Sequence, residues 1–191
     1  MTDHIPMARR LRAILDSATD QEWAEGTYWY AVAHSFAAEL ADRYGVSVEC
    51  AAGVIAALSP RLSWTMNQRA AETLFASGDA PVLHSNKAKA LQILAGQNPL
   101  TVLGGAKVRA FYACIVSPVA DAVCVDRHAV DAAVGYKGTD KSRKFLDRVG
   151  AYESVAAAYR VTADRYGISP AQCQAIVWVV WRGVHGNRRA A

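Results

Sequence analysis

Two residues of the chain, Asp126 and Lys107, have types and neighbours that suit catalysis. Asp126 stands in Val123-Cys-Val-Asp-Arg-His-Ala129, directly before a helical pattern, where the exposed amides of a helix start favour an ionised carboxylate. Such a carboxylate can stabilise positive charge that builds up in a transition state. Lys107 follows a glycine pair, and a partly desolvated lysine amine can act as a nucleophile. Each residue also has a structural interpretation, Asp126 as a helix cap and Lys107 as a solvated residue of a first turn.

The charge of the chain suits an anionic partner without requiring one. The sequence has 21 basic and 17 acidic residues, which gives a formal net charge of +4. Such a balance is compatible with nucleic-acid binding and with an ordinary enzyme. The densest basic cluster lies late in the chain and is equally compatible with a nucleic-acid contact or a solvated helix face; its members are Lys137, Lys141, Arg143, Lys144 and Arg148.

Composition and periodicity predict that helices position all of these residues. Alanine, which loses least on entering a helix, accounts for 37 of 191 residues. We therefore predict an all-α fold of about ten helices and no sheet. Trp178 and Trp181, on the last helix, are expected in the core. Apolar spacing, caps and glycine stops predict helices at 7–18, 27–44, 47–58, 63–76, 85–96, 100–103, 106–116, 127–134, 141–149, 152–166 and from 169 onward.

The order and spacing of four motifs resemble the helix-hairpin-helix (HhH-GPD) DNA glycosylase superfamily, of which endonuclease III is the type. Leu103-Gly-Gly-Ala-Lys-Val-Arg-Ala-Phe-Tyr112 resembles its glycine-rich hairpin and following lysine. The stretch 123–129 resembles its Val-Asp-x-His loop, which carries the essential aspartate. Residues 54–67 resemble the helix-turn-helix before its substrate pocket, and residues 178–186 resemble the helix that closes its second lobe. Within the superfamily, the chain resembles compact members of phage or actinobacterial type without the iron–sulfur loop.

This resemblance implies a two-lobed fold and an activity on DNA. Lobe one would span about 47–135, lobe two about 1–46 plus 136–186, and residues 187–191 would form a tail. The protein would bind double-stranded DNA, flip a base out of the duplex and cleave its N-glycosidic bond, in repair or in base modification.

The resemblance also assigns roles to individual residues. Asp126 would stabilise the positive charge that develops on the sugar, and Lys107 would attack C1′, form a Schiff base and cleave the strand. The candidate DNA-binding residues are Gly104, Gly105, Arg109, Arg61 and Arg127, with Arg61 and Arg109 equally compatible with solvent-facing side chains. The candidate pocket residues are Ser59, Trp64, Asn67 and His128, with a core position as the alternative for Trp64 and a packing or hydrogen-bonding role as the alternative for His128.

Other features narrow the class of protein. The four cysteines, Cys50, Cys114, Cys124 and Cys173, form no C-x-x-C pair, so we expect reduced core thiols, no metal and no cofactor. No apolar run reaches about 18 residues and the first residues lack a signal-peptide core, so we expect a cytoplasmic protein without a membrane partner. Two alternatives stay open: a catalytically inactive DNA-binding protein on the same fold, and a protein-interaction domain.

Overall fold

The described part of the chain is entirely helical. The structure is a computed structural model that describes residues 4–185, apart from the side chains of Ser142 and Asp147. These residues form eleven α-helices and one short 3₁₀ helix, η1, and no strand occurs among them. The predicted all-α fold is therefore confirmed, while the predicted tail at 187–191 lies outside the described residues.

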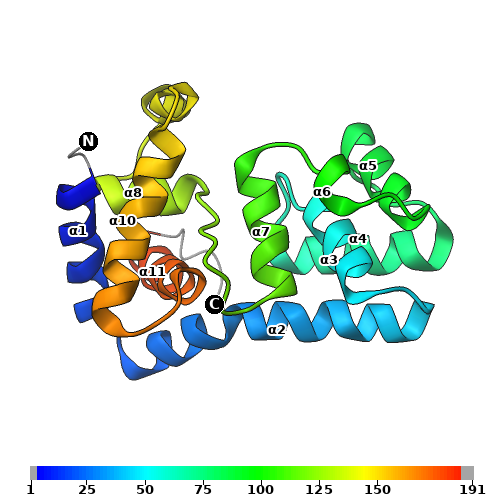
Figure 1. Cartoon of the computed structure of the whole chain (residues 1–191), viewed down its shortest axis with the longest axis horizontal. Helices are drawn as coiled ribbons and strands as arrows, with labels where there is room; N and C mark the ends of the chain where they lie inside the picture. The colour runs from blue at the N-terminus through cyan, green and yellow to red at the C-terminus, as the bar shows by residue number, and fades with distance from the viewer. Residues whose placement is uncertain (1–3, 186–191) are drawn as a thin grey trace. The chain divides into compact units, whose positions relative to one another are not determined.

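The helices follow one another with short connections (Figure 1). In chain order they are α1 (His4–Asp16), α2 (Asp20–Tyr44), α3 (Val48–Leu58), α4 (Trp64–Ser77), α5 (His84–Leu94), α6 (Pro99–Val102), α7 (Ala106–Val116), α8 (Arg127–Val134), α9 (Asp140–Arg143), η1 (Lys144–Asp147), α10 (Ala151–Tyr166) and α11 (Pro170–His185).

The chain divides into two compact units, and α2 contributes to both. Unit 1 comprises Met1–Tyr30 and Pro118–Ala191, and unit 2 comprises Ala31–Ser117. These boundaries differ from the expected lobe boundaries near residues 46 and 135. The difference arises because the second half of α2 packs within unit 2, where the Phe36 ring contacts Trp64, whereas α8 packs against α1 and α11 within unit 1.

In unit 1, α1, α8, α10 and α11 pack around one hydrophobic core. Leu11 of α1 and Ile176 of α11 are fully buried there. Tyr159 of α10 is also fully buried, and its hydroxyl donates to the carbonyl oxygen of Ala129 in α8 over 3.0 Å. This bond satisfies a buried polar group, as a stable core requires. It also ties the first turn of α8, which Asp126 precedes, to the core.

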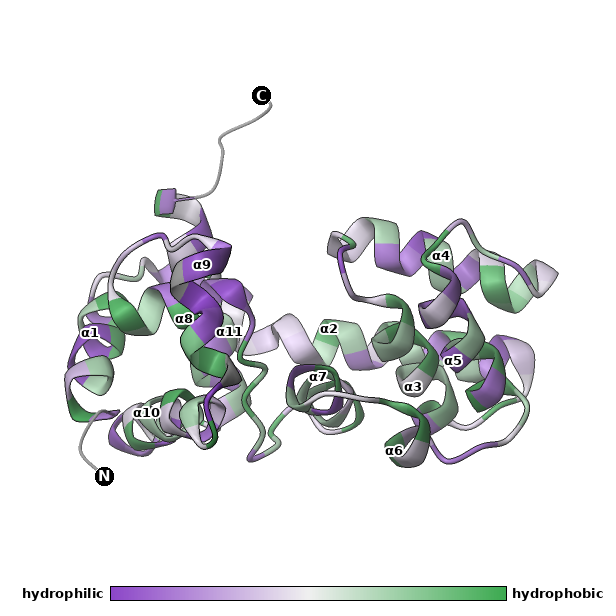
Figure 2. Cartoon of the chain, turned by 90° about the horizontal axis from the view of Figure 1, so that it is seen from above, coloured by the Kyte–Doolittle hydropathy of each residue, from purple (hydrophilic) through white to green (hydrophobic). Residues whose placement is uncertain are grey.

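In unit 2, α3 lies at the centre, because every residue from Ala51 to Leu58 is buried. The helices α4, α5, α6 and α7 all pack against it. Gly53 allows the close approach of α6, since a Cβ atom there would lie 2.8 Å from Cγ of Pro99. Figure 2 shows the hydrophobic residues of α3 in green.

Local signals account for most helix boundaries. Ser47, Ser63 and Asp126 accept hydrogen bonds from the first turns of α3, α4 and α8. Ser169 and Gln172 exchange hydrogen bonds in a capping box before α11, as predicted.

Three predicted helices differ from the structure, the first being α1, which spans His4–Asp16 and not 7–18. α2 begins at Asp20 and not at Thr27, because Thr19 and Glu22 form a further capping box. The predicted helix at 141–149 is instead split into α9 and the 3₁₀ turn η1.

Gly26 of α2 should be intolerant of a side chain. A Cβ atom there would collide with Cα of Ile176 in α11 and lie 2.7 Å from the backbone nitrogen of Ile176. We expect Gly26→Ala to lower the free energy of unfolding by about 1–3 kcal/mol through overpacking, despite the higher helix propensity of alanine. Chemical denaturation measures this loss.

Gly183 of α11 provides the matched control for Gly26. A Cβ atom there would meet only the Oε1 end of Glu22, at 3.3 Å, so a shift of a few tenths of an ångström in this side chain is enough. We therefore expect Gly183→Ala to be neutral or stabilising by up to about 1 kcal/mol. Equal effects of the two substitutions would contradict the close contact between α2 and α11.

Candidate functional site

A short extended segment delivers Asp126 to the start of α8 in unit 1. Val123, Cys124 and Val125 are buried, which explains why this apolar run forms no exposed loop. The hydroxyl of Tyr152 donates to the carbonyl oxygen of Val123 (2.7 Å) and accepts from the amide of Val125 (3.2 Å). Both ends of the run are thus held by one side chain of α10, so the position of Asp126 is well defined.

Asp126 caps α8 and remains partly exposed. Its backbone is extended (φ −89°, ψ −178°), and its Oδ1 accepts from the amide of Ala129 over 2.8 Å. The second carboxylate oxygen accepts no hydrogen bond in the part of the chain that the structure describes. The N-terminus of α8 favours negative charge at this position. The site therefore presents a partly exposed carboxylate that is fixed through one oxygen by the helix start.

Basic and aromatic side chains lie beside this carboxylate within unit 1. The exposed Arg127 donates from Nε to Nε2 of His128 over 3.3 Å, which requires an unprotonated Nε2. Burial lowers the pKa of His128 below its ordinary value; the nearby carboxylate of Asp126 opposes this effect, whereas Arg127 and Arg182 add to it. Arg182 in turn lies over the ring of Trp178, 4.4 Å from the ring centre.

Arg182 is a residue that the sequence reasoning missed. α11 packs against α8, and the charge of Arg182 near the end of α11 helps to lower the pKa of His128. The signal that could have found it is the four-residue spacing of Trp178 and Arg182, which brings an aromatic ring and a guanidinium together on one helix face. Trp181 is in the core as expected (6% exposed), whereas Trp178 is only half-buried.

A buried ion pair anchors the segment that follows α8. Asp131 is 1% exposed, and both of its carboxylate oxygens accept from Arg143, at 2.9 Å from Nε and 2.6 Å from Nη2. Nη2 also donates to the carbonyl oxygen of Gly138 over 2.6 Å. The hydrogen bond to Asp131 raises the pKa of Arg143 further above its already high value. Arg143 therefore has a structural partner and is not a free member of the predicted basic cluster.

In unit 2, the glycine pair forms the turn between α6 and α7. Gly105 has φ +76°, a conformation that favours glycine, and it is the residue before α7. Lys107 is exposed in the first turn of α7, so unit 2 itself does not provide the desolvation that a neutral amine needs. Arg109, a predicted phosphate contact, donates from Nε to the carbonyl oxygen of Leu103 over 2.7 Å and so stabilises the turn.

The predicted pocket residues of unit 2 have mostly structural contacts. Ser59 donates to the carbonyl oxygen of Ala56 at the end of α3, and Trp64 packs edge-on against Phe36. Asn67 is 2% exposed and donates to the carbonyl oxygen of Ile55 over 3.1 Å, so it lies in the core and does not line an open pocket. The burial arises because α4 packs directly against the fully buried α3.

The predicted site residues thus fall into two groups. Asp126, Arg127 and His128 lie together in unit 1. The others belong to unit 2, namely Ser59, Arg61, Trp64, Asn67, Gly104, Gly105, Lys107 and Arg109. Arg61, which is exposed, has a positive φ of 71°, unusual for a residue with a side chain. The two predicted catalytic residues, Asp126 and Lys107, belong to different units.

Thiols and other ligating groups do not form a metal site in the described region. Three cysteines are buried, Cys50 is partly buried, and none of the four forms a disulfide within the part of the chain that the structure describes. Burial raises the pKa of the Cys173 and Cys50 thiols, which disfavours thiolates. Within residues 4–185, no three His, Cys, Asp or Glu side chains are grouped so that they could hold a metal ion. None of the described helices has the length and apolar character needed to span a membrane.

Fold and site together define an all-α protein of two helical units, one of which presents a capped and partly open aspartate. Residues 2–185 match a family of unknown function, DUF7178, and the chain belongs to this family. Searches of curated proteins and of solved structures find no match.

Proposed function

We propose that the protein binds DNA and cleaves the N-glycosidic bond of a damaged or modified base. The observation that carries the proposal is Asp126, a partly exposed carboxylate fixed by the helix start of α8. The motif resemblance to the HhH-GPD glycosylases supports the same role for this residue. Breaking the bond between C1′ and the base leaves positive charge on the sugar, and an adjacent carboxylate stabilises that charge. Water then adds to C1′, and the base leaves with a proton.

The neighbours of Asp126 suit a phosphodiester substrate. Arg127 is exposed beside the carboxylate, and Arg182 is held in place by Trp178. These two guanidinium groups, whose charges both act on His128, can contact phosphates next to the reacting nucleotide. Burial lowers the pKa of His128 and so disfavours its charged form, which suits its role as the hydrogen-bond acceptor toward Arg127.

Lys107 adds a second, separable part of the proposal. If its amine attacks C1′, the base departs and a Schiff base joins the protein to the sugar. The exposure of Lys107 in unit 2 means that bound DNA has to supply its desolvation. A protein that releases the base without this step uses water as its only nucleophile.

A duplex panel with borohydride tests both parts. Each duplex carries one probe, such as uracil, an oxidised purine, an alkylated adenine, a hydroxymethylated pyrimidine or an abasic site. We expect base release from at least one of the base-bearing duplexes, and borohydride should trap the protein covalently because it reduces a Schiff base. Lys107→Ala should abolish trapping.

Lys87→Ala is the matched control, because Lys87 is in the same unit and is already paired with Asp79. Base release without trapping would assign water as the nucleophile. DNA binding with no release from any duplex would contradict the proposed chemistry and favour the binding-protein alternative.

A further inference from the structure

Residues 136–148, here called the basic excursion, connect α8 to the residues before α10. They hold five basic and two acidic residues, a formal charge of +3 in a stretch of thirteen. Figure 1 shows this segment in yellow, projecting beyond α8 and α10, and Figure 2 shows α9 as hydrophilic. The excursion is therefore a projecting segment with a net positive charge (Figure 1).

The basic excursion is attached to unit 1 by the buried ion pair between Asp131 and Arg143. The Arg143 side chain is 16% exposed and the Asp131 side chain 2%, and their two hydrogen bonds are short. The further bond to Gly138 closes the loop on itself. Because α8 holds Asp131, the excursion is fixed to the same helix that Asp126 caps.

Of the five basic residues of the excursion, Arg143 forms the ion pair that attaches it to unit 1. Within α9 each residue advances by about 100°, so Lys141, two residues before Arg143, lies on the opposite side of this helix. Lys137, Lys141, Lys144 and Arg148 are all exposed. None of the four forms an ion pair with any side chain that the structure describes.

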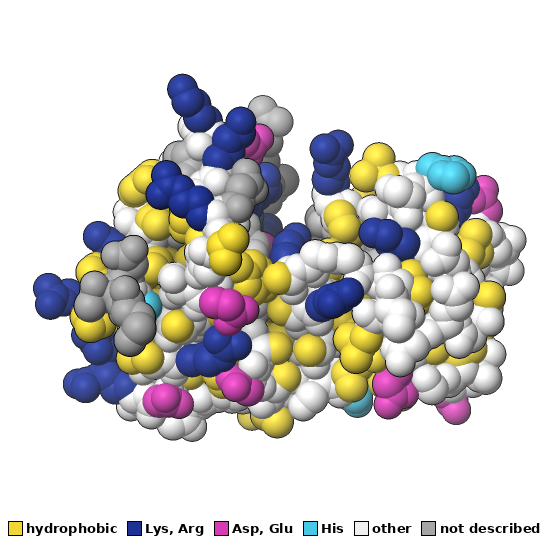
Figure 3. Space-filling view, turned by 45° about the horizontal axis from the view of Figure 1, so that its top comes forward, with side chains coloured by type: hydrophobic (Ala, Val, Ile, Leu, Met, Phe, Trp, Pro, Cys, Tyr) yellow, Lys and Arg dark blue, Asp and Glu magenta, His cyan; other side chains and the backbone are white. Residues whose placement is uncertain are grey.

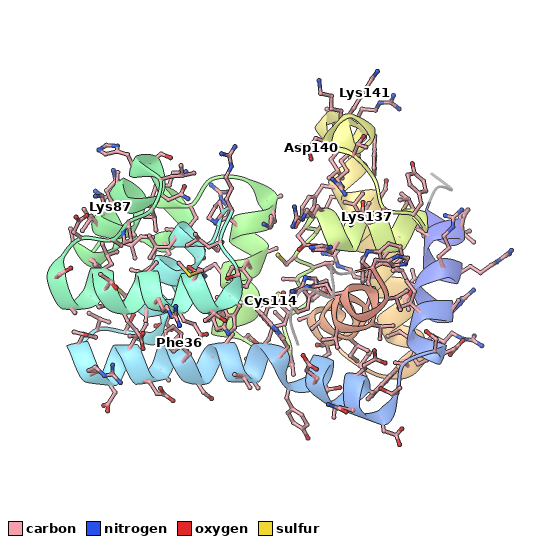
Figure 4. All side chains as sticks on the ribbon, turned by 180° about the vertical axis from the view of Figure 1, so that it is seen from behind. Phe36, Lys87, Cys114, Lys137, Asp140 and Lys141 are labelled. Atoms are coloured by element: carbon pink, nitrogen blue, oxygen red, sulfur yellow. The ribbon has the colours of Figure 1, made fainter. Side chains whose placement is uncertain are left out.

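The surface around the basic excursion is also rich in basic side chains (Figure 3). Figure 3 shows Lys and Arg side chains gathered on this part of unit 1, and Figure 4 shows Lys141 directed outward from α9. Asp140, the described carboxylate of the excursion, is held by Arg143 at 3.4 Å. Four exposed cations that form no ion pair with a described side chain therefore face solvent on a segment whose base is fixed.

We propose that the basic excursion binds the phosphodiester backbone of DNA, beside the nucleotide at which Asp126 acts. The inference rests on the proposed function for its choice of DNA. Asp131 follows Asp126 by five residues, an axial distance of about 7.5 Å along α8. A duplex that reaches Asp126 therefore has its flanking phosphates within range of the excursion. Lysine ammonium groups bind phosphates as point charges without a demand for base sequence.

The salt dependence of DNA binding tests this assignment. We compare the full chain with the triple variant Lys137→Gln, Lys141→Gln and Lys144→Gln on an undamaged fluorescent duplex. Each lost phosphate contact lowers the slope of log Kobs against log salt by about 0.9. We expect a slope smaller by about 2–3 and an affinity at low salt lower by on the order of tenfold to hundredfold.

A matched triple variant on other helices of unit 1 removes the same charge. Arg9→Gln, Arg12→Gln and Arg165→Gln change exposed or half-buried residues of α1 and α10 and should leave the slope within about 1 of the unmodified chain. Equal losses in the two triple variants would show a general charge effect and overturn the assignment. So would an unchanged slope in the lysine variant, or the absence of DNA binding by the unmodified chain.

Two further measurements separate this inference from its rivals. A lysine variant that loses binding to phosphatidylserine vesicles while keeping its DNA slope would assign the excursion to a lipid surface and overturn the proposal. Base release on the same duplexes tests the chemistry independently. Steep, lysine-dependent DNA binding without base release would support the excursion and refute the proposed glycosylase activity.

Discussion

Asp126→Asn should slow base release by about 10²-fold or more, the scale of losing one preorganised electrostatic group. Asparagine is as good a helix cap as aspartate, so the hydrogen bond to the amide of Ala129 and the start of α8 should survive. The substitution thus removes the charge and keeps the structure. Single-turnover base release at saturating protein measures the rate. The free energy of unfolding, measured by thermal denaturation, should change by less than about 1 kcal/mol.

Asp121→Asn provides the control for this charge change. Asp121 is an exposed aspartate of unit 1 that pairs with Arg160, and its loss should leave the rate unchanged. If the Asp126→Asn variant released the base as fast as the unmodified chain, Asp126 would act only as a helix cap. A slow rate accompanied by a large loss of stability would likewise contradict a purely chemical role.

Short-range signals were enough to predict most helices of this protein. The predicted bounds of α7 and α8 match the structure, because a glycine turn, an aspartate cap and a final glycine lie within the few residues that each boundary depends on. The start of α2 was missed although its signal is equally local. Thr19 and Glu22 have the capping-box spacing, which the apolar pattern beginning near Thr27 obscured.

The candidate site was only partly accessible from sequence, because part of it depends on packing. The cap at Asp126 follows from its neighbours in the chain. The burial of Asn67 depends on the contact between α4 and α3, and the role of Arg182 depends on α11 meeting α8. In the sequence, Arg143 is one of several basic residues in the same stretch. Its hydrogen bonds to Asp131, which only the structure shows, give it a structural role that the neighbouring lysines lack.

Arg143→Met should lower the free energy of unfolding by about 3–5 kcal/mol, because it leaves the buried carboxylate of Asp131 without its partner. The cost exceeds that of a surface pair since the Asp131 side chain is 2% exposed and cannot be solvated in place. Urea denaturation followed by circular dichroism measures the loss. Arg160→Met is the matched control: Arg160 also contacts two carboxylates, Asp121 and Glu153, but at the surface, so about 0.2–1 kcal/mol is expected.

The double variant Asp131→Leu and Arg143→Met distinguishes an unpaired buried charge from the loss of favourable contacts. If the cost of Arg143→Met comes from the stranded carboxylate, removing that carboxylate as well should recover most of the lost stability, since an apolar pair of similar volume often replaces a buried ion pair without loss. The double variant should then unfold within about 1–2 kcal/mol of the unmodified chain. A double variant as unstable as Arg143→Met would show instead that the hydrogen bonds of the guanidinium, including the one to Gly138, stabilise the base of the excursion directly.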